Sequence, residues 1–212
     1  MASGASAWWS RPWGNDVTEG TKRLFIAVDP GEACHARIVE AVGLARPHAP
    51  RARWVRTEGI HVTLVFLGAV AESLVPAVVA NMETVAARHD PFTLRFEGAG
   101  CFGGRKPRVL WIPVAGDVPA LGLVQKELSE ALTEIGYVPE ERLFSPHLTL
   151  ARAGFGGTDA GLWAAARALA AESFGEVDVR ELVLYESVLS EAGAHYEAVA
   201  RLPLGGVPAP LH

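Results

Sequence analysis

Two short segments, one in each half of the chain, carry residue types that could transfer protons at a phosphate. They read HVTL at residues 61–64 and HLTL at residues 147–150, and each lies in an apolar run typical of a β-strand. Side chains of a strand alternate between its two faces, so His61 and His147 each share a face with the threonine two residues later. If the two strands are neighbours, two imidazoles and two hydroxyls converge on one surface.

This set of groups suits the hydrolysis of a phosphoester. The attacking and leaving oxygens lie roughly in line through phosphorus, so one imidazole can accept a proton from water while the other donates one to the leaving oxygen. The hydroxyls of Thr63 and Thr149 can bind the non-bridging oxygens. A strained five-membered cyclic phosphate would need no metal. A lone histidine in a strand is more often structural, and the spacing alone leaves both interpretations open.

The apolar patterning predicts strands and helices around both motifs. Four helices are expected. The first stops near Pro47, the second covers 74–86, the third runs from Asp117 as N-cap to Gly136 as C-cap, and the fourth covers 159–171. Strands are expected at residues 23–28, 53–56, 59–67, 92–96, 109–114, 146–152, 177–189 and 195–202, the last two antiparallel, with Gly68 ending the third strand and a loop at 98–108.

Each half therefore holds one H-x-T-L strand with helices and further strands around it. This order predicts an α+β, bilobal fold, in which two pseudo-symmetric lobes each place a small antiparallel sheet against helices and the active-site cleft lies between them. A single domain is expected at residues 21–204. We expect a flexible N-terminal tail at 1–20, which Trp8, Trp9 or Trp13 could dock, and a C-terminal tail at 205–212.

The composition argues against several other classes of protein. A formal net charge of −5 disfavours coating of long nucleic acid but is compatible with a local phosphate site. Two cysteines, Cys34 and Cys101, and the absence of a signal-peptide pattern at residues 1–20 favour reduced thiols in a cytoplasmic protein. No apolar run reaches the length of a membrane span, and no Cys, His and carboxylate cluster has metal-ligand spacing. No membrane, metal or cofactor is therefore expected.

Five segments carry a resemblance to a known family. They read RLFIAVDP, RWVRTEGIHVTLVFLG, KPRVLWIPV, RLFSPHLTLAR and LVLYESVLSEAGAHYEAVARLPL. From about Arg23 to Leu204 the sequence resembles the RNA 2′,3′-cyclic phosphodiesterases, also called 2′-5′ RNA ligases, of the two-histidine (2H) phosphoesterase superfamily. It departs from them in its N-terminal extension and at Val65, where relatives often carry a polar or basic residue that could alter substrate contacts.

The resemblance implies an activity and a set of site residues. The activity is metal-free, ATP-independent hydrolysis of 2′,3′-cyclic phosphates at RNA ends to 2′-phosphates, with weak reversible 2′-5′ ligation. His61 would donate a proton to the leaving 3′ oxygen, and His147 would activate water. Thr63 and Thr149 would bind the phosphate. Arg152, at the end of the second strand, could pair with a substrate phosphate, and the alternative is a solvated strand-end charge.

Two other functions remain open at this point. One is a cyclic phosphodiesterase for a small nucleotide metabolite, since the absence of a basic stripe leaves RNA unproven as substrate. The other is a non-catalytic module that binds RNA ends. The two histidines argue against it, because binding alone does not need two titratable groups. The expected partners are RNA 3′ ends or cyclic nucleotides as substrate, with no protein partner, and the expected state is a monomer.

The remaining residues of interest are given weaker roles or none. Phe66 lies on the Val62 side of its strand by alternation, which favours the core over base stacking. Lys106 and Arg108 are expected to be solvated loop charges. His195, in a strand near the end, could line a cleft. No role is assigned to His35, His48, His89 and Cys101.

Overall fold

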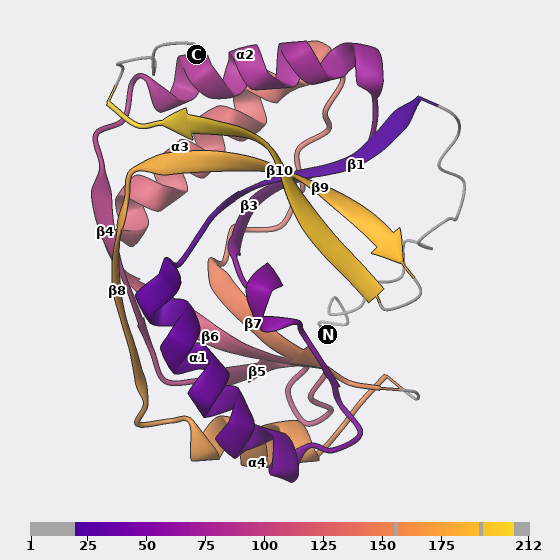
Figure 1. The fold of residues 1–212 in the computed structure, drawn as a ribbon, viewed down its shortest axis with the longest axis vertical. Coiled ribbons are helices and arrows are strands. Elements are labelled where there is room, and N and C mark those ends of the chain that lie inside the picture. Colours follow the sequence, from indigo (N-terminus) through magenta and orange to yellow (C-terminus); the bar gives the residue numbers. More distant parts are fainter. Residues whose placement is uncertain (1–19, 155–156, 191–192, 206–212) are drawn as a thin grey trace.

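A computed structural model describes residues 20–154, 157–190 and 193–205, shown as a ribbon in Figure 1. The predicted tails, with Trp8, Trp9 and Trp13, lie outside the described residues except for Gly20 and Gly205. The helices are α1 (Glu32–Ala45), α2 (Val75–Ala86), α3 (Val118–Ala131) and α4 (Gly161–Ala168). The strands are β1 (Thr21–Val28), β2 (Arg53–Trp54), β3 (Val62–Ala71), β4 (Phe92–Glu97), β5 (Gly100–Phe102), β6 (Val109–Gly116), β7 (His147–Arg152), β8 (Ser173–Val179), β9 (Glu181–Ser190) and β10 (Gly193–Pro203).

The strands form a curled antiparallel sheet that confirms the predicted α+β class. Its order is β10-β9-β1-β3-β7-β6-β4-β8, with β2 paired to β7 and β5 paired to β6. The strands β3 and β7 meet at one register pair, Val62 opposite Leu148. This single pair joins two halves of the sheet, which are the two lobes.

Helices cover each lobe on its outer side, but they do not follow the two halves of the sequence (Figure 1). Helices α2 and α3 pack on each other and against β3, β4, β9 and β10. Helices α1 and α4 pack on each other, α1 against β8 and α4 against β5 and β6. The first helix therefore covers strands of the second lobe, and the last two strands complete the sheet of the first. An amphipathic helix packs on whichever apolar face is open, which its own pattern does not reveal.

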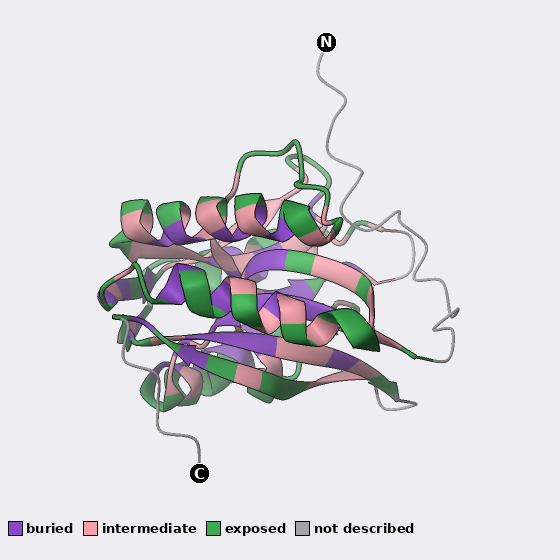
Figure 2. Cartoon of the chain, turned by 90° about the horizontal axis from the view of Figure 1, so that it is seen from above, coloured by how far each residue is buried: buried purple, intermediate pink, exposed green. Residues whose placement is uncertain are grey.

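The core lies between these helices and the sheet. Figure 2 shows buried residues on the inward sides of the helices and exposed residues on their outer sides. In β1 the alternation places Leu24, Ile26 and Val28 on the core face, each at most 1% exposed. Burying one such side chain contributes roughly 1.5–3 kcal/mol, so the core face fixes which side chains of each strand remain for a site.

A β-bulge in β3 overturns the prediction for Phe66. Ile26 pairs with Val65, but the next residue, Ala27, pairs with Thr63, so Leu64 is an extra residue in β3. Leu64 and Val65 are both buried, and the alternation is reversed after them. Phe66 is consequently 38% exposed instead of lying in the core, and the Arg23 guanidinium lies 5.6 Å from its ring centroid.

Other boundaries differ from the predicted ones for local reasons. Gly68 does not end β3, because the strand passes through it at a φ of 73°, which glycine adopts without strain, and continues to Ala71. The expected strand at 177–189 is two strands, separated at Arg180. Asp117 is the N-cap residue of α3 as predicted, but its carboxylate accepts the backbone N–H of Thr93 at 3.0 Å and makes no hydrogen bond to the helix. The short strand β5 forms inside the predicted loop at 98–108.

Candidate active site

The register of β3 and β7 brings the four predicted polar side chains to one face. Because the strands are antiparallel and Val62 faces Leu148, one further step places His61 across from Thr149 and Thr63 across from His147. Val62 and Leu148 are fully buried on the other face, whereas the two histidines and two threonines are half-buried. The site therefore lies at the junction of the lobes.

Backbone and aromatic contacts hold the ring of His61. Its Nδ1 donates to the Gly59 carbonyl at 2.7 Å. The ring stacks on Phe25, with centroids 4.6 Å apart, and meets the edge of Tyr196 at 5.2 Å. A Cβ atom at Gly59 would lie 2.9 Å from the Tyr196 ring, so only glycine fits this turn. With Nδ1 protonated, Nε2 of the neutral ring is left with its lone pair.

His147 has a matching environment in the other lobe. Its Nδ1 donates to the Ser145 carbonyl at 2.8 Å. The Phe102 ring lies edge-on at 5.0 Å and stacks on Trp111, with centroids 4.7 Å apart. A Cβ at Gly100 would lie 2.8 Å from the Trp111 ring. Each histidine therefore has its Nδ1 bonded to a backbone carbonyl and lies against aromatic rings, one of which packs on a glycine.

Burial depresses the basicity of both imidazoles. Desolvation lowers the pKa of His61 to about 4, although its hydrogen bond to Gly59 and the charge of Asp29 act to raise it. Desolvation likewise lowers the pKa of His147 below its ordinary value. Both rings are therefore largely neutral near pH 7 in the free protein. An anion bound between them would favour the imidazolium form of either ring.

Arg152 lies close enough to act on both histidines. Its side chain is exposed by accessible surface, yet protein surrounds enough of it that desolvation lowers the pKa of its guanidinium. Its positive charge lowers the pKa of His61 and of His147. Arg152 therefore lies on the same side of the sheet as the two imidazoles, within range of their charges.

A second β-bulge explains how Arg152 reaches this face. Leu110 pairs with Ala151 and Trp111 pairs with Thr149, so Leu150 is an extra residue in β7. Strict alternation would have put Arg152 on the core side, as it would Phe66. The bulge occupies the same position, three residues after the histidine, in both motif strands.

Several aromatic residues of the site were not predicted. Tyr196 contacts His61 and Phe25, and the charge of Arg152 acts on its phenol. Its neighbour His195, predicted as a residue that could line a cleft, pairs instead with Glu197 at 3.1 Å. Alternation within β10 separates Tyr196 from His195, but only the observed pairing shows which one faces the site.

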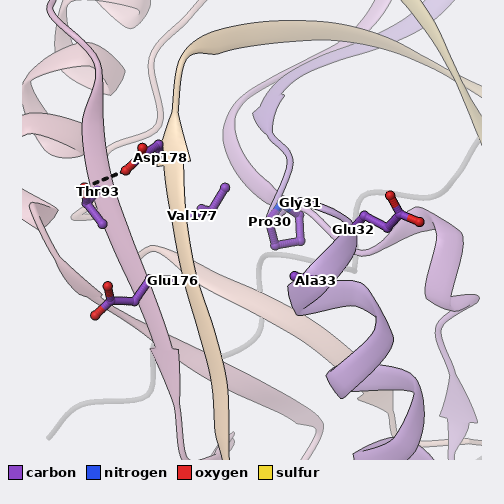
Figure 3. Close-up of a pocket in the computed structure, with 8 residues that line it drawn as sticks. All are labelled: Pro30, Gly31, Glu32, Ala33, Thr93, Glu176, Val177 and Asp178. Carbon is purple, nitrogen blue, oxygen red and sulfur yellow. Dashed lines mark hydrogen bonds between the residues drawn. The ribbon is translucent and has the colours of Figure 1, made fainter.

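The described part of the protein also has cavities that none of the predicted site residues line. Figure 3 shows one of about 380 Å³ between the start of α1 and β8. Its lining includes the carboxylates of Glu32, Glu176 and Asp178, and the Thr93 hydroxyl donates to Asp178 at 2.9 Å. Its acidic lining repels phosphate, and none of the predicted site residues line it. The histidine face is therefore the candidate site.

The described residues also bear on metals, thiols and membranes. Within residues 20–154, 157–190 and 193–205, no three His, Cys, Asp or Glu side chains group as ligands for a metal ion. Cys34 and Cys101 are free thiols. No helix in those same ranges has the length and apolar character needed to cross a membrane.

Comparison with known proteins identifies the family. The sequence profile of the 2′-5′ RNA ligase superfamily matches residues 29–190. The RNA 2′,3′-cyclic phosphodiesterase of Geobacillus stearothermophilus is 35% identical over 185 residues, which are 87% of this chain but only 58% of that protein. The protein of the same name from Archaeoglobus fulgidus is 31% identical over 82% of this chain and 96% of its own length.

Solved structures agree with the sequence comparison. A crystal structure from Thermus thermophilus superimposes with a TM-score of 0.72 at 28% identity, covering 87% of this chain and 98% of that one. E. coli LigT complexed with 3′-AMP superimposes with a TM-score of 0.68 at 26% identity and the same coverage. The paired histidine motifs, the curled sheet and the family profile agree, and the chain belongs to the 2′-5′ RNA ligase superfamily.

Proposed function

We propose that this protein hydrolyses 2′,3′-cyclic phosphates at RNA ends to 2′-phosphates by metal-free acid–base catalysis with His61 and His147. The observation that carries the proposal is the convergence of two imidazoles and two hydroxyls at the junction of β3 and β7. Relatives that share most of the chain are named RNA 2′,3′-cyclic phosphodiesterases, and the LigT structure holds 3′-AMP.

In this proposal each proton has a stated donor and acceptor. Nε2 of neutral His147 accepts a proton from water while the water oxygen attacks phosphorus. The bond from phosphorus to the 3′ oxygen breaks, and that oxygen takes a proton from Nε2 of the His61 imidazolium. The product carries a 2′-phosphate and a 3′-hydroxyl. The hydroxyls of Thr63 and Thr149 donate to the non-bridging oxygens, whose charge grows in the transition state.

The proposal extends to weak, reversible 2′-5′ ligation. A 5′-hydroxyl of a second RNA end that replaces water as nucleophile would yield a 2′-5′ bond, with the same 3′ leaving oxygen and the same two proton transfers. Water is far more concentrated than RNA ends, so hydrolysis is the dominant reaction.

His61 needs the negative charge of the substrate to keep its ring protonated. With a pKa of about 4, His61 is mostly neutral in the free protein at neutral pH. The anionic phosphodiester beside it stabilises the imidazolium and raises its pKa in the complex. Loss of activity at high pH therefore follows the titration of His61, and loss at low pH follows protonation of His147, whose pKa burial also lowers. The two titrations are coupled, so the limbs of the profile belong to the pair.

Hydrolysis without a metal is the direct test of the function. Phosphorus NMR should show a 2′,3′-cyclic nucleotide turning into the 2′-phosphate at an unchanged rate in excess chelator. A rate lost in chelator and restored by a divalent ion would contradict the metal-free mechanism. Running a cyclic mononucleotide beside an oligonucleotide with a cyclic end tests RNA as substrate, because a preference for the mononucleotide would favour a small metabolite.

Replacing Arg152 with alanine should weaken substrate binding more than catalysis. The charge of the guanidinium acts on both histidines, which supports a role for Arg152 in binding the phosphate. KM should rise by roughly 10- to 100-fold, since a charge-assisted hydrogen bond is worth roughly 1.5–3 kcal/mol, and it should rise less at high salt. Steady-state kinetics at two ionic strengths measures this. An unchanged KM at low salt would mean that Arg152 is a solvated strand-end charge.

A further inference from the structure

His35 lies between two hydrogen-bond acceptors. From α1 its Nε2 reaches the Asp29 carboxylate at the end of β1, 3.3 Å away, and its Nδ1 lies 3.1 Å from the Thr57 carbonyl oxygen. Neither oxygen carries a proton, and a neutral imidazole has a single N–H. Only the doubly protonated ring satisfies both contacts, so the geometry describes an imidazolium paired with Asp29.

The carbonyl that accepts from His35 belongs to Thr57, the first residue of the turn that holds His61. Residues Thr57–Gly59 form one turn of 3₁₀-helix, and the same Thr57 carbonyl accepts the Ile60 N–H at 3.2 Å. The carbonyl at the other end of the turn, on Gly59, accepts Nδ1–H of His61 at 2.7 Å. His35 thus holds the first residue of a turn whose last residue orients the His61 ring.

The turn is braced on its other side as well. The Tyr196 ring packs against Gly59 so closely that a Cβ there would lie 2.9 Å from ring atoms. Asp29 is itself held, because its carboxylate accepts the Gly31 N–H at 2.7 Å. The carbonyl that selects the His61 tautomer is therefore fixed through His35, Asp29 and Tyr196.

The charges around His35 favour its imidazolium form. Asp29 raises the pKa of His35 by a direct hydrogen bond, against desolvation, and Glu58 on the turn adds to the rise. Desolvation would raise the pKa of Asp29, but its bonds to His35 and Gly31 outweigh this and hold that pKa low. The phenol of Tyr185 and the guanidinium of Arg201 also face Asp29 from the last two strands.

We propose that the His35–Asp29 ion pair is a positioning device for His61, which fixes the turn at Thr57–Gly59 and with it the Nδ1–H tautomer that presents Nε2 to substrate. The inference rests on the proposed function for its kinetic consequence, whereas the tautomer itself does not depend on any activity. Neither residue touches the reacting atoms. Their loss should affect the rate of chemistry and leave phosphate binding in place.

The test compares His35→Gln with a matched control, His195→Gln. Both variants remove an imidazole that pairs with a carboxylate, and His195 pairs with Glu197 away from the site. In the full-length protein, His35→Gln should lower kcat by about 10- to 100-fold, the cost of a misplaced catalytic group. KM and the Kd for inorganic phosphate should stay within about twofold, as a mispositioned His61 impairs chemistry and not binding. The control should retain wild-type values.

Nitrogen NMR of the histidine rings reports the protonation state and tautomer of each ring in the folded protein, which a simple loss of stability would not change. In the wild-type protein at pH 7, both His35 nitrogens should carry protons and His61 should be the Nδ1–H tautomer. In folded His35→Gln, the His61 tautomers should be mixed. Asp29→Asn should leave His35 with one ring proton.

Several outcomes would overturn the proposal. A single neutral tautomer of His35 in the wild-type protein would overturn it. This measurement needs no variant, so the proposal can be tested even if His35→Gln fails to fold. Kinetics and a His61 tautomer like those of the His195→Gln control would also overturn it. If no cyclic phosphate is hydrolysed at all, the proposed function fails, while the ring-nitrogen measurements still decide whether His35 positions His61.

Discussion

Replacing His147 with alanine is expected to lower kcat on a 2′,3′-cyclic nucleotide by about 10²- to 10⁴-fold, the usual contribution of one general acid or base. His61→Ala should cause a similar loss on that substrate, because either proton transfer is then missing. The two variants should differ on an activated aryl ester, whose leaving group needs no proton. There His61→Ala should retain much of the wild-type rate and His147→Ala should not.

Steady-state kinetics of both variants on both substrates checks this assignment. His48→Ala is a suitable control, because His48 is exposed in the turn after α1 and lies outside the site. Equal losses on the aryl ester would contradict the opposite roles of the two histidines. A 3′-phosphate product from the wild-type protein would instead show that the 2′ oxygen leaves.

Removing either threonine hydroxyl is expected to have the next largest effect. Thr63→Val and Thr149→Val keep the shape of the side chain and delete the hydroxyl that we propose donates to the phosphate. Each should lower kcat by roughly 10²-fold or more, as the loss of one preorganised transition-state donor does. Thermal unfolding should change little, because both side chains are half-buried and valine suits a strand.

Thr93→Val is the matched control for these variants. Its hydroxyl donates to Asp178 in the cavity beside α1, which none of the predicted site residues line. It should therefore leave kcat and KM unchanged. Wild-type kinetics in both Thr63→Val and Thr149→Val would mean that the hydroxyls do not contact the phosphate.

The sequence allowed prediction of the parts of the site that follow from alternation. A histidine and a threonine two residues apart must share a face of a strand, and His61, Thr63, His147 and Thr149 do so. It also allowed prediction of the α+β class, because strand and helix periods differ clearly along the chain. The side-by-side placement of β3 and β7 had to be assumed, because pairing between distant strands leaves no local pattern in the sequence.

The contacts missed by sequence reasoning are those between distant segments. His35 contacts Thr57 across 22 residues, and no spacing rule connects them. Tyr196 approaches His61 because β10 pairs with β9 and β9 pairs with β1, which places the C-terminal strands beside the N-terminal one. Phe66 and Arg152 were placed by simple alternation or left undecided, because a bulge of one residue has no composition of its own.

The twin bulges make the two nearly identical motif strands differ on the face that carries the histidines. By inserting one leucine at the same step, each motif strand turns its fifth residue after the histidine toward the site, and there the two strands differ. The His61 strand presents the flat phenyl ring of Phe66, and the His147 strand presents the cationic Arg152. A substrate with a planar base at one end and negative charge at the other can match this pair in one orientation only. Two nearly identical motifs would in this way meet opposite sides of phosphorus, one the leaving oxygen and the other the attacking water.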